Sequence, residues 1–524
     1  MSNGKNIVTG LDLETLLKTG EISQIRISKL SKSVNINDRL YAAELIGNAS
    51  NKETTTYLLE LLHDINPKVR IAAINAAEKN YNNEVLNGLI DNLDSPIYSN
   101  LALNSLLIIG ENSFKALESE FYKAGQNVQV MLKIVQIYGR IGGPKAIELL
   151  WNKIDYPDKI LVTQILTSLG DCGFKASVNQ ITRIKYAIES DVEDIAWNMA
   201  AIDEIPDNQI GKQLREAVRE ENTHDIDHIY TLLAMLYDAK SIQLIKQNIE
   251  SGTNDGVTYA IELLDVFLSE DLKEKMIPVL DDISESEKAK KLEILFPRQE
   301  LGAKEVLKYL INRDFNQTNR WSKACAIEQI GIMKIENYLY DLIANLFNPD
   351  PLVMEISARS IYQINQDQYH THTKRLGLDT KELLDHIVMQ DGSKKLKFDK
   401  ILVLKEMDIF SRVPGRILAS VVDAMEEIII KEGESFSLDS IYGNSFYVVF
   451  EGEIDYFQAG SIKRKIEKGE FVGELLDDEN RSQSNVFQAT TDTIVLVISK
   501  DKFYGLLSDN YVFAQSVMQY HYAS

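Results

Sequence analysis

The chain has 524 residues, of which 44% are hydrophobic and 26% are charged, and its formal net charge is -22 at pH 7. This length exceeds what one hydrophobic core usually serves, so two or more domains are expected. The acidic balance argues against a nucleic-acid partner, because neutralising phosphates requires a basic surface.

The cysteine content and the termini bear on the compartment. Cys172 and Cys325 are the only cysteines and lie far apart in apolar helical patterns, which argues against a disulfide scaffold and favours a reducing compartment. No apolar run approaches the length of a membrane span, and the first residues, MSNGKNIVTG, lack the pattern of a signal peptide. These features predict a cytoplasmic protein. The asparagine-, isoleucine- and lysine-rich composition is associated with bacteria whose genomes are AT-rich.

Residues 11–390 are predicted to be almost entirely helical, because apolar side chains recur at spacings of three and four and prolines are few. A segment rich in small residues recurs there about every 30 residues, as expected of a repeat protein. Its copies end at Gly47, Ala77, Gly110, Gly142 and Gly170. Each is predicted to be the second helix of a pair whose small residues allow close stacking on the next pair. This pattern is typical of an α-solenoid.

The clearest copy, LLELLHDINPKVRIAAINAA, resembles the HEAT repeat. Pro67 ends one helix and presets the turn into the next, while Asp64 or Asn66 can accept hydrogen bonds from free backbone amides. A second copy has its turn at residues 348–351, and the segment 321–333 is predicted to be the second helix of the copy before it. Between about residues 180 and 310 the pattern is more charged, and paired helices are still expected.

Residues 391–524 carry a different pattern. Glycines at Gly433, Gly443, Gly452, Gly469 and Gly473 punctuate short β-branched and aromatic runs, which predicts a compact antiparallel roll with tight turns. Residues 398–510 resemble the cyclic-nucleotide-binding domain, through the lead-in LKEMDIFSRVP, the hairpin at Gly452 and the segment GEFVGE. The amphipathic C-terminal segment 506–524 is predicted to pack back on the roll or on the solenoid, with docking to a partner as the alternative.

The resemblance implies a phosphate-binding cassette beginning at Gly473 and Glu474. In this family the glutamate accepts a ribose hydroxyl, and an arginine about nine residues later binds the cyclic phosphate at a helix N-terminus. Here Gln483 occupies the position of that arginine, and three acids at residues 477–479 would repel an anion. The sequence therefore argues against a bound cyclic nucleotide. Two alternatives stay open: Arg481 takes the place of the arginine, or Glu474 only satisfies loop amides.

The boundary between the two parts is predicted near residues 391–393, followed by a basic patch of Lys394, Lys395, Lys397 and Lys400. The preceding segment, 376–388, is predicted to be helical. It is interpreted as a solvated connector, or alternatively as a lever that moves with the ligand state of the roll.

Other candidate sites receive structural interpretations. His224 and His228 stand four apart, a spacing that metal sites use, but no third ligand is identifiable and both are predicted to be exposed polar helix residues. His370 and His372 are predicted to lie in a turn-like segment. No phosphate loop, nucleophile elbow or Cys–His pairing occurs, so neither catalysis, nor a metal, nor a cofactor is predicted.

The predicted architecture is thus mainly α: a HEAT-like α-solenoid over 11–390, then a small antiparallel β-roll with flanking helices over 391–524. The predicted function is a non-catalytic scaffold or regulatory adaptor whose solenoid surface binds proteins. The alternative is a regulator gated by a cyclic nucleotide or another small ligand at Gly473, Glu474, Arg481 and Gln483. The pairing of the two parts also resembles the cytoplasmic part of bacterial nucleotide-transporter fusions, which implies a membrane protein as one class of partner.

Overall fold

The computed structural model describes residues 24–48, 55–95, 97–297, 301–314, 317–389, 394–436, 445–458, 461–472 and 486–523. The chain divides into two compact units, Met1–Ser177 and Val178–Ser524, which are described separately. The expected fold class, a mainly α chain of paired helices followed by antiparallel sheets, is confirmed. The predicted boundary at 390/391 stays a prediction.

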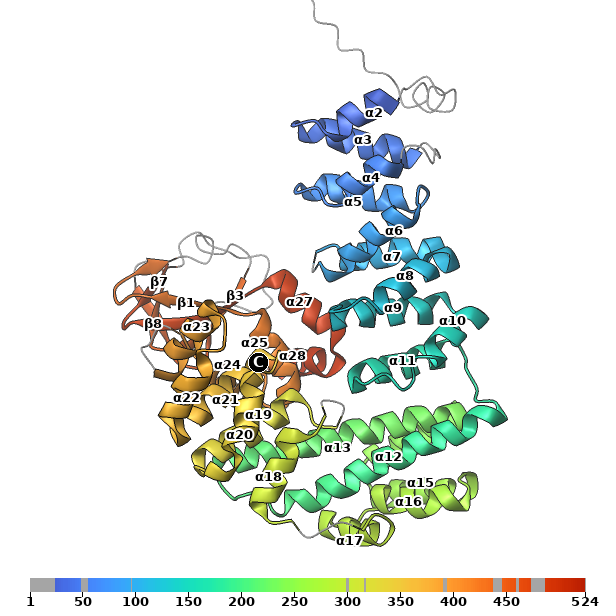
Figure 1. The fold of residues 1–524 in the computed structure, drawn as a ribbon, viewed down its shortest axis with the longest axis vertical. Coiled ribbons are helices and arrows are strands. Elements are labelled where there is room, and N and C mark those ends of the chain that lie inside the picture. The colour runs from blue at the N-terminus through green and yellow to red at the C-terminus, as the bar shows by residue number, and fades with distance from the viewer. Residues whose placement is uncertain are drawn as a thin grey trace, which may run out of the picture. The chain divides into compact units, whose positions relative to one another are not determined.

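The first unit is a stack of helix pairs that follow one another in chain order (Figure 1). The pairs are α2 (Gln24–Ser31) with α3 (Ile36–Asn48), α4 (Thr55–Leu61) with α5 (Pro67–Ala77), α6 (Asn83–Asp91) with α7 (Ser99–Ile109), α8 (Phe114–Phe121) with α9 (Val128–Ile141), and α10 (Gly143–Trp151) with α11 (Lys159–Asp171). Short 3-10 helices, η2 (Asn92–Asp94) and η3 (Gly110–Ser113), precede α7 and α8. The five small-residue segments predicted to be second helices are α3, α5, α7, α9 and α11.

The turn of the clearest repeat forms as its sequence predicts. Pro67 is the first residue of α5, and the side chain of Asn66 accepts a hydrogen bond from the Lys68 amide at 3.0 Å. Asp64 accepts one from the Asn66 amide at 2.8 Å. Both polar residues of the turn therefore satisfy backbone donors that the helix start would leave free.

Polar contacts join each repeat to the turn of the next. Arg39 on α3 donates hydrogen bonds from Nε and Nη2 to the carboxylate of Asp64, at 2.6 and 3.1 Å. Arg70 on α5 donates to Asn92 Oδ1 at 2.7 Å and lies 4.5 Å from the centre of the Tyr98 ring. These contacts fix the register of successive repeats, while the apolar faces of the helices supply most of the burial.

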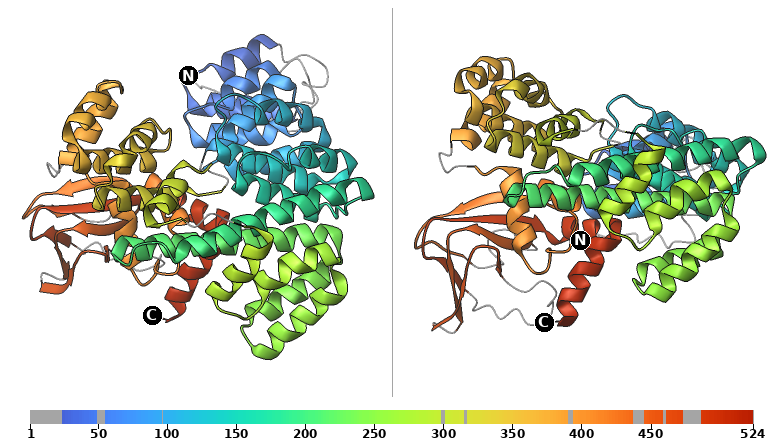
Figure 2. Two further views of the ribbon diagram at one scale, coloured as in Figure 1. Left: turned by 60° about the horizontal axis from the view of Figure 1, so that its bottom comes forward. Right: turned by 90° about the horizontal axis from the view of Figure 1, so that it is seen from below.

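The second unit begins with two long helices, α12 (Val178–Ile202) and α13 (Gln209–Leu236), which lie side by side in both views of Figure 2. Paired helices were expected here, and these two are about twice the length of the repeat helices. Shorter helices follow: α14 (Ala239–Glu250), α15 (Asn254–Phe267), α16 (Glu270–Leu280), α17 (Glu285–Leu295) and α18 (Ala303–Asn312).

Repeat-like pairs then return. They comprise α19 (Arg320–Ile332), η4 (Glu336–Tyr338), α20 (Leu339–Leu346), α21 (Pro351–Ile364), α22 (Gln366–Thr373) and α23 (Leu378–Met389). The turn before α21 matches its prediction, because Asp350 caps the helix and Pro351 opens it. Val353, Ala358 and Ile361 of α21 are fully buried.

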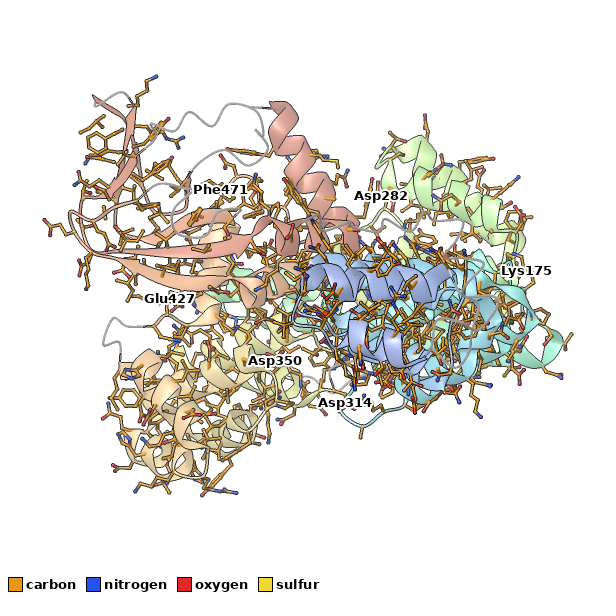
Figure 3. The ribbon with its side chains drawn as sticks, turned by 90° about the horizontal axis from the view of Figure 1, so that it is seen from above. Lys175, Asp282, Asp314, Asp350, Glu427 and Phe471 are labelled. Atoms are coloured by element: carbon orange, nitrogen blue, oxygen red, sulfur yellow. The ribbon has the colours of Figure 1, made fainter. Side chains whose placement is uncertain are left out.

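Two helices, α24 (Lys397–Glu406) and α25 (Gly415–Ala424), lead into the strands, and α27 (Lys500–Asp509) and α28 (Tyr511–Ala523) follow them. The strands are β1 (Glu426–Ile430), β2 (Ser435–Phe436), β3 (Ser445–Glu451), β4 (Ile454–Gln458), β5 (Ser461–Ile466), β6 (Phe471–Val472), β7 (Val486–Ala489) and β8 (Thr493–Ser499). They form two antiparallel sheets, ordered β1-β8-β3-β6 and β2-β7-β4-β5. Glu427 on β1 and Phe471 on β6 mark the two edge strands of the first sheet (Figure 3).

The first sheet is buried on both faces. On β8, Leu496 and Ile498 pack into the core shared with the helices, whereas Val495 and Val497 pack between the two sheets. This explains why β8 reads as a continuous apolar run rather than as an alternation. At the predicted hairpin Gly452 has φ +95°, and a Cβ there would lie 2.5 Å from Thr493 Oγ1, so the turn requires glycine.

Candidate functional site

The residues predicted to line the ligand cassette, Gly473, Glu474, Arg481 and Gln483, lie outside the described residues, as do the three acids at 477–479. The described strands before and after these residues show which sheets the segment connects. β6 ends at Val472 in the first sheet, and β7 begins at Val486 in the second sheet. The segment 473–485 therefore connects one sheet to the other.

Strand β6, which precedes that segment, contacts the helices around the roll. Phe471 packs edge-to-face against Phe410, with ring centres 5.8 Å apart. Phe410 lies between α24 and α25 and also contacts Phe513 of α28, at 5.7 Å. Ser516 of α28 donates a hydrogen bond to the Ile409 carbonyl at 2.7 Å. The C-terminal helices thus pack on the roll and its lead-in, which was one of the two predicted arrangements.

We define residues 394–425, which carry α24 and α25, as the helix–sheet junction. Of the four lysines predicted to form a basic patch here, three are ion-paired within the unit. The pairs are Lys395 with Glu451, Lys397 with Asp423 and Lys400 with Glu427, at N–O distances of 2.6 to 2.7 Å. The charges of these three lysines are therefore largely neutralised, and the pairs with Glu451 and Glu427 link the junction to β3 and β1.

An acidic face of α13 binds the same junction. Lys405 on α24 lies 2.9 Å from a Glu216 oxygen and 3.7 Å from a Glu220 oxygen. The amide of Gly415, at the start of α25, donates to Glu220 Oε2 at 3.2 Å. Burial raises the pKa of Glu220 to about 7, although Lys405 opposes the rise. Burial also lowers the pKa of Arg416, which faces the α13 acids.

The neighbouring Glu221 anchors a different helix. It accepts hydrogen bonds from the backbone amide and the side-chain amide of Asn319, at 2.9 and 2.8 Å. Asn319 in turn caps α19. Burial raises the pKa of Glu221 to about 7. Two adjacent acids of α13 thus hold two separate helix starts.

Arginine clusters join α19 and α21 to the junction. Arg359 on α21 donates two hydrogen bonds to Asp399 at 2.9 Å and also binds Glu328 on α19. Arg320 binds Asp423 of α25 and Asp350, at 2.6 and 3.3 Å. Such partly buried, hydrogen-bonded ion pairs are geometrically specific, so they set the orientation of α24 and α25 on the helical repeats.

A close packing contact lies at the centre of this network. Trp321 is fully buried and stacks on Phe398, with ring centres 5.0 Å apart. A Cβ on Gly415 would lie 2.2 Å from Trp321 Nε1. Only glycine therefore fits at the start of α25. The carboxyl of Glu355, nearby on α21, accepts from the Lys397 amide at 2.9 Å, and burial raises its pKa to about 7.

The histidines differ from their predictions. His228 is buried rather than exposed, and its Nδ1 lies 2.6 Å from Asp191 Oδ2 on α12; His224 is half-buried. His370 and His372 lie on α22 and not in a turn. Among the residues that the structure describes, no group of three or more His, Cys, Asp or Glu side chains could hold a metal ion. Cys172 and Cys325 are free thiols.

Sequence reasoning did not find the α13 carboxylates that bind the junction and α19. The segment of α13 that carries Glu216, Glu220 and Glu221 was interpreted only as a charged, diluted part of the repeat pattern. The i, i+4 spacing of Glu216 and Glu220 places both on one helix face. That spacing was the available signal, and an exposed face of a surface helix shows the same spacing.

Comparison with known proteins supports both parts. Residues 24–106 match the family model of HEAT repeats. A stretch of 108 residues is 32% identical to a cAMP-dependent protein kinase regulatory subunit from Aspergillus niger, over 20% of this chain and 26% of that protein. The chain thus spans about a quarter of this relative's length. Within the described residues, no helix is both long enough and apolar enough to cross a membrane.

Two solved structures show local likeness. The sensor domain of the transcriptional regulator DNR from Pseudomonas aeruginosa is 14% identical, with 24% of this chain and 91% of that chain covered and a TM-score of 0.22. The complex of CpcE and CpcF of phycocyanin lyase from Nostoc sp. PCC7120 is 17% identical, with 51% and 97% covered and a TM-score of 0.20.

Proposed function

We propose that this chain is a non-catalytic regulatory scaffold that binds protein partners on the turn edge of its HEAT repeats. The observation that carries the proposal is a regular row of exposed apolar side chains in the first unit. Val34, Ile65 and Ile97 are 97%, 97% and 61% exposed, and each lies in the turn between the two helices of its repeat. Val128 and Ile160, also exposed, are the first residue of α9 and the second residue of α11.

The row follows the repeat. Its members stand 31 or 32 residues apart in sequence, which is one residue from each successive helix pair. Isolated exposed apolar residues need no explanation, but a row of them along one edge is typical of an interaction surface. Stacked repeats present such edges without needing a pocket. The partner is a protein, and the transporter-like resemblance keeps a membrane protein at its cytoplasmic face among the partner classes.

The test replaces the row and leaves the cores intact. The triple variant Val34→Ser, Ile65→Ser, Ile97→Ser is expected to keep the wild-type melting temperature and to lose cross-links to partner proteins in extracts of the source organism. The matched control changes exposed apolar residues away from the row, Ile108→Ser with Tyr122→Ser. Equal loss of cross-links in both variants, or in neither, would contradict the proposal.

A regulator gated by a small ligand is the second candidate. It is favoured by the contacts of Phe471, because this residue lies two positions before segment 473–485 and packs against Phe410 of the helix–sheet junction. A ligand bound by that segment would therefore act on α24 and α25. The thermal-shift titration with cyclic AMP, cyclic GMP and cyclic dinucleotides separates the two candidates. A ligand at 100 times its Kd stabilises the folded state by about 2.7 kcal/mol.

Variants of the predicted cassette residues test what a shift in melting temperature means. A stabilisation lost in Glu474→Ala, and reduced in Arg481→Gln, would favour the gated regulator. If none of the nucleotides changes the melting temperature and Gln483→Ala leaves the cross-links unchanged, the scaffold proposal stands.

A further inference from the structure

A pocket in the second unit lies between α12, α17 and α18, far in sequence from the cassette. Glu193 and Trp197 stand four residues apart on one face of α12, and Glu293 and Phe296 come from the end of α17. Tyr309 of α18 closes a third side. These five residues surround a cavity of about 220 Å³, which we call the α12–α17 pocket. Three alanines also line it: Ala196, Ala200 and Ala289.

Aromatic rings form the walls of the α12–α17 pocket. The rings of Trp197 and Tyr309 have centres 5.9 Å apart and are inclined by 38°. The small alanine side chains leave room beside them. The indole of Trp197 already accepts one cation from the chain itself, because the guanidinium of Arg313 lies 4.2 Å from the ring centre. Arg313 does not line the cavity, and Asp194 and Asn198 hold it in place.

Two carboxylates also line the pocket. Glu193 and Glu293 are both exposed. Within the described parts of the chain, no ion pair or hydrogen bond engages either side-chain carboxylate, whereas other acids of this region, such as Glu189 and Asp281, have a lysine partner. Two carboxylates beside electron-rich ring faces disfavour an anion and favour a cation. A neutral apolar guest would use the rings and gain nothing from the charges.

We propose that the α12–α17 pocket binds an organic cation, specifically an alkylated ammonium group. Such a group offers an apolar surface to Trp197, Phe296 and Tyr309 and a positive charge to the two glutamates. The cavity is smaller than the about 300–1,000 Å³ of most ligand pockets, so it takes a head group rather than a large molecule. The group is either free in solution or carried on a side chain of another protein. This site is independent of the proposed scaffold function.

Matched probes test the role of charge. Choline and 3,3-dimethyl-1-butanol have nearly the same shape, and only choline is charged. Isothermal titration of the full chain is expected to show choline binding at least about tenfold tighter than the alcohol, because only the cation interacts with ring faces and carboxylates. Equal affinity of the two probes would overturn the proposal, since the pocket would then bind both through apolar contacts alone.

Variants locate the binding. Glu193→Gln with Glu293→Gln is expected to weaken choline binding about tenfold, since both carboxylates act directly on the cation. Glu274→Gln removes the same charge from α16 outside the pocket and should leave the affinity unchanged. Tyr309→Leu should weaken binding, and Tyr309→Phe, which keeps the ring, should restore it. A double glutamine variant that binds like the Glu274→Gln control would overturn the site.

A further arm identifies the source of the cation. The probe is a short peptide carrying one trimethyllysine, compared with the same peptide carrying norleucine. Saturable binding of choline supports a free metabolite, and binding of the trimethyllysine peptide alone supports a modified partner protein. If neither choline nor the peptide binds, the proposal is wrong.

Discussion

In the repeats of the first unit charged side chains stay at the turns, whereas in the helix–sheet junction they enter the interior. Arg39 and Asp64 pair at the edge of the stack, and the helix faces below them are apolar. On α13 and α21, beside the junction, Glu221 and Glu355 are buried and Glu220 is largely buried, and burial raises the pKa of each to about 7. In a stack of similar repeats, each repeat only has to stay aligned with the next one. At the junction, helices from distant parts of the chain meet, and specific ion pairs fix how they pack.

One residue of the first unit departs from this division. The ammonium of Lys153 is fully buried against Glu118, with both N–O distances 2.7 Å. Phe121 and Tyr138 surround it, and burial lowers its pKa. The pair joins the turn after α10 to α8 within two adjacent repeats, so even here a buried charge fixes how two elements pack.

The largest expected effect separates packing at the junction from packing in a repeat. Trp321→Ala removes a fully buried ring that stacks on Phe398, and it should lower the free energy of unfolding of the second unit by about 3–5 kcal/mol. Hydrogen exchange measured by mass spectrometry on the full chain should show the loss in α19, α24 and α25. Leu58→Ala in the first unit is the matched control, whose effect should stay in that unit.

Lys405→Met tests whether the buried charges at the junction need their partners. The variant leaves Glu220 without its cation, and unfolding should become easier by about 2 kcal/mol at pH 8. The loss should shrink at pH 6, because Glu220 then takes up a proton. Lys465→Met breaks an exposed pair with Glu453 and should have no measurable effect. An equal loss at both pH values would contradict a role for the Glu220 charge.

The pH dependence of the two units should differ. Glu220, Glu221 and Glu355 have pKa values of about 7 when folded and an ordinary value of 4.5, so between these values the folded state holds more protons than the unfolded one. Stability of the second unit should therefore fall as the pH rises from about 4.5 to 7. Each carboxyl should change the free energy of unfolding by on the order of 1–3 kcal/mol at most.

Hydrogen exchange at pH 5.5 and pH 8, corrected for the intrinsic rates, checks this prediction in the intact chain. Glu355→Gln should reduce the pH dependence around α21 and α24. A first unit that shows the same pH dependence as the second would break the comparison.

The smallest expected effect is in the regular repeats of the first unit. Asn66→Ala removes the cap of α5 and should lower stability by about 1 kcal/mol, with the change confined to the neighbouring helices. Asp350→Ala removes the equivalent cap of α21 and also a partner of Arg320, so it should cost more. Equal losses at the two caps would show that the arginine contact adds nothing.

The sequence predicted best where the interactions are local. The turn at Asp64, Asn66 and Pro67 could be predicted because its hydrogen bonds run between residues two apart. The lysines after residue 393 were identified, but their acidic partners on β1, β3 and α25 are up to 56 positions away. For the same reason His228 was predicted to be exposed, since its partner Asp191 lies 37 residues earlier on α12.

The sequence by itself determined the mainly α class, the repeat with its turns and the antiparallel roll, because periodicity, capping and glycine placement act over a few residues. Only the tertiary structure decided which charges are buried, that the Trp321 ring leaves room only for glycine at position 415, and that Glu193 and Glu293 line one pocket with aromatic rings. Those features depend on which distant faces pack together. The free energy of a buried or unpaired charge is set by that packing and not by its neighbours in the chain.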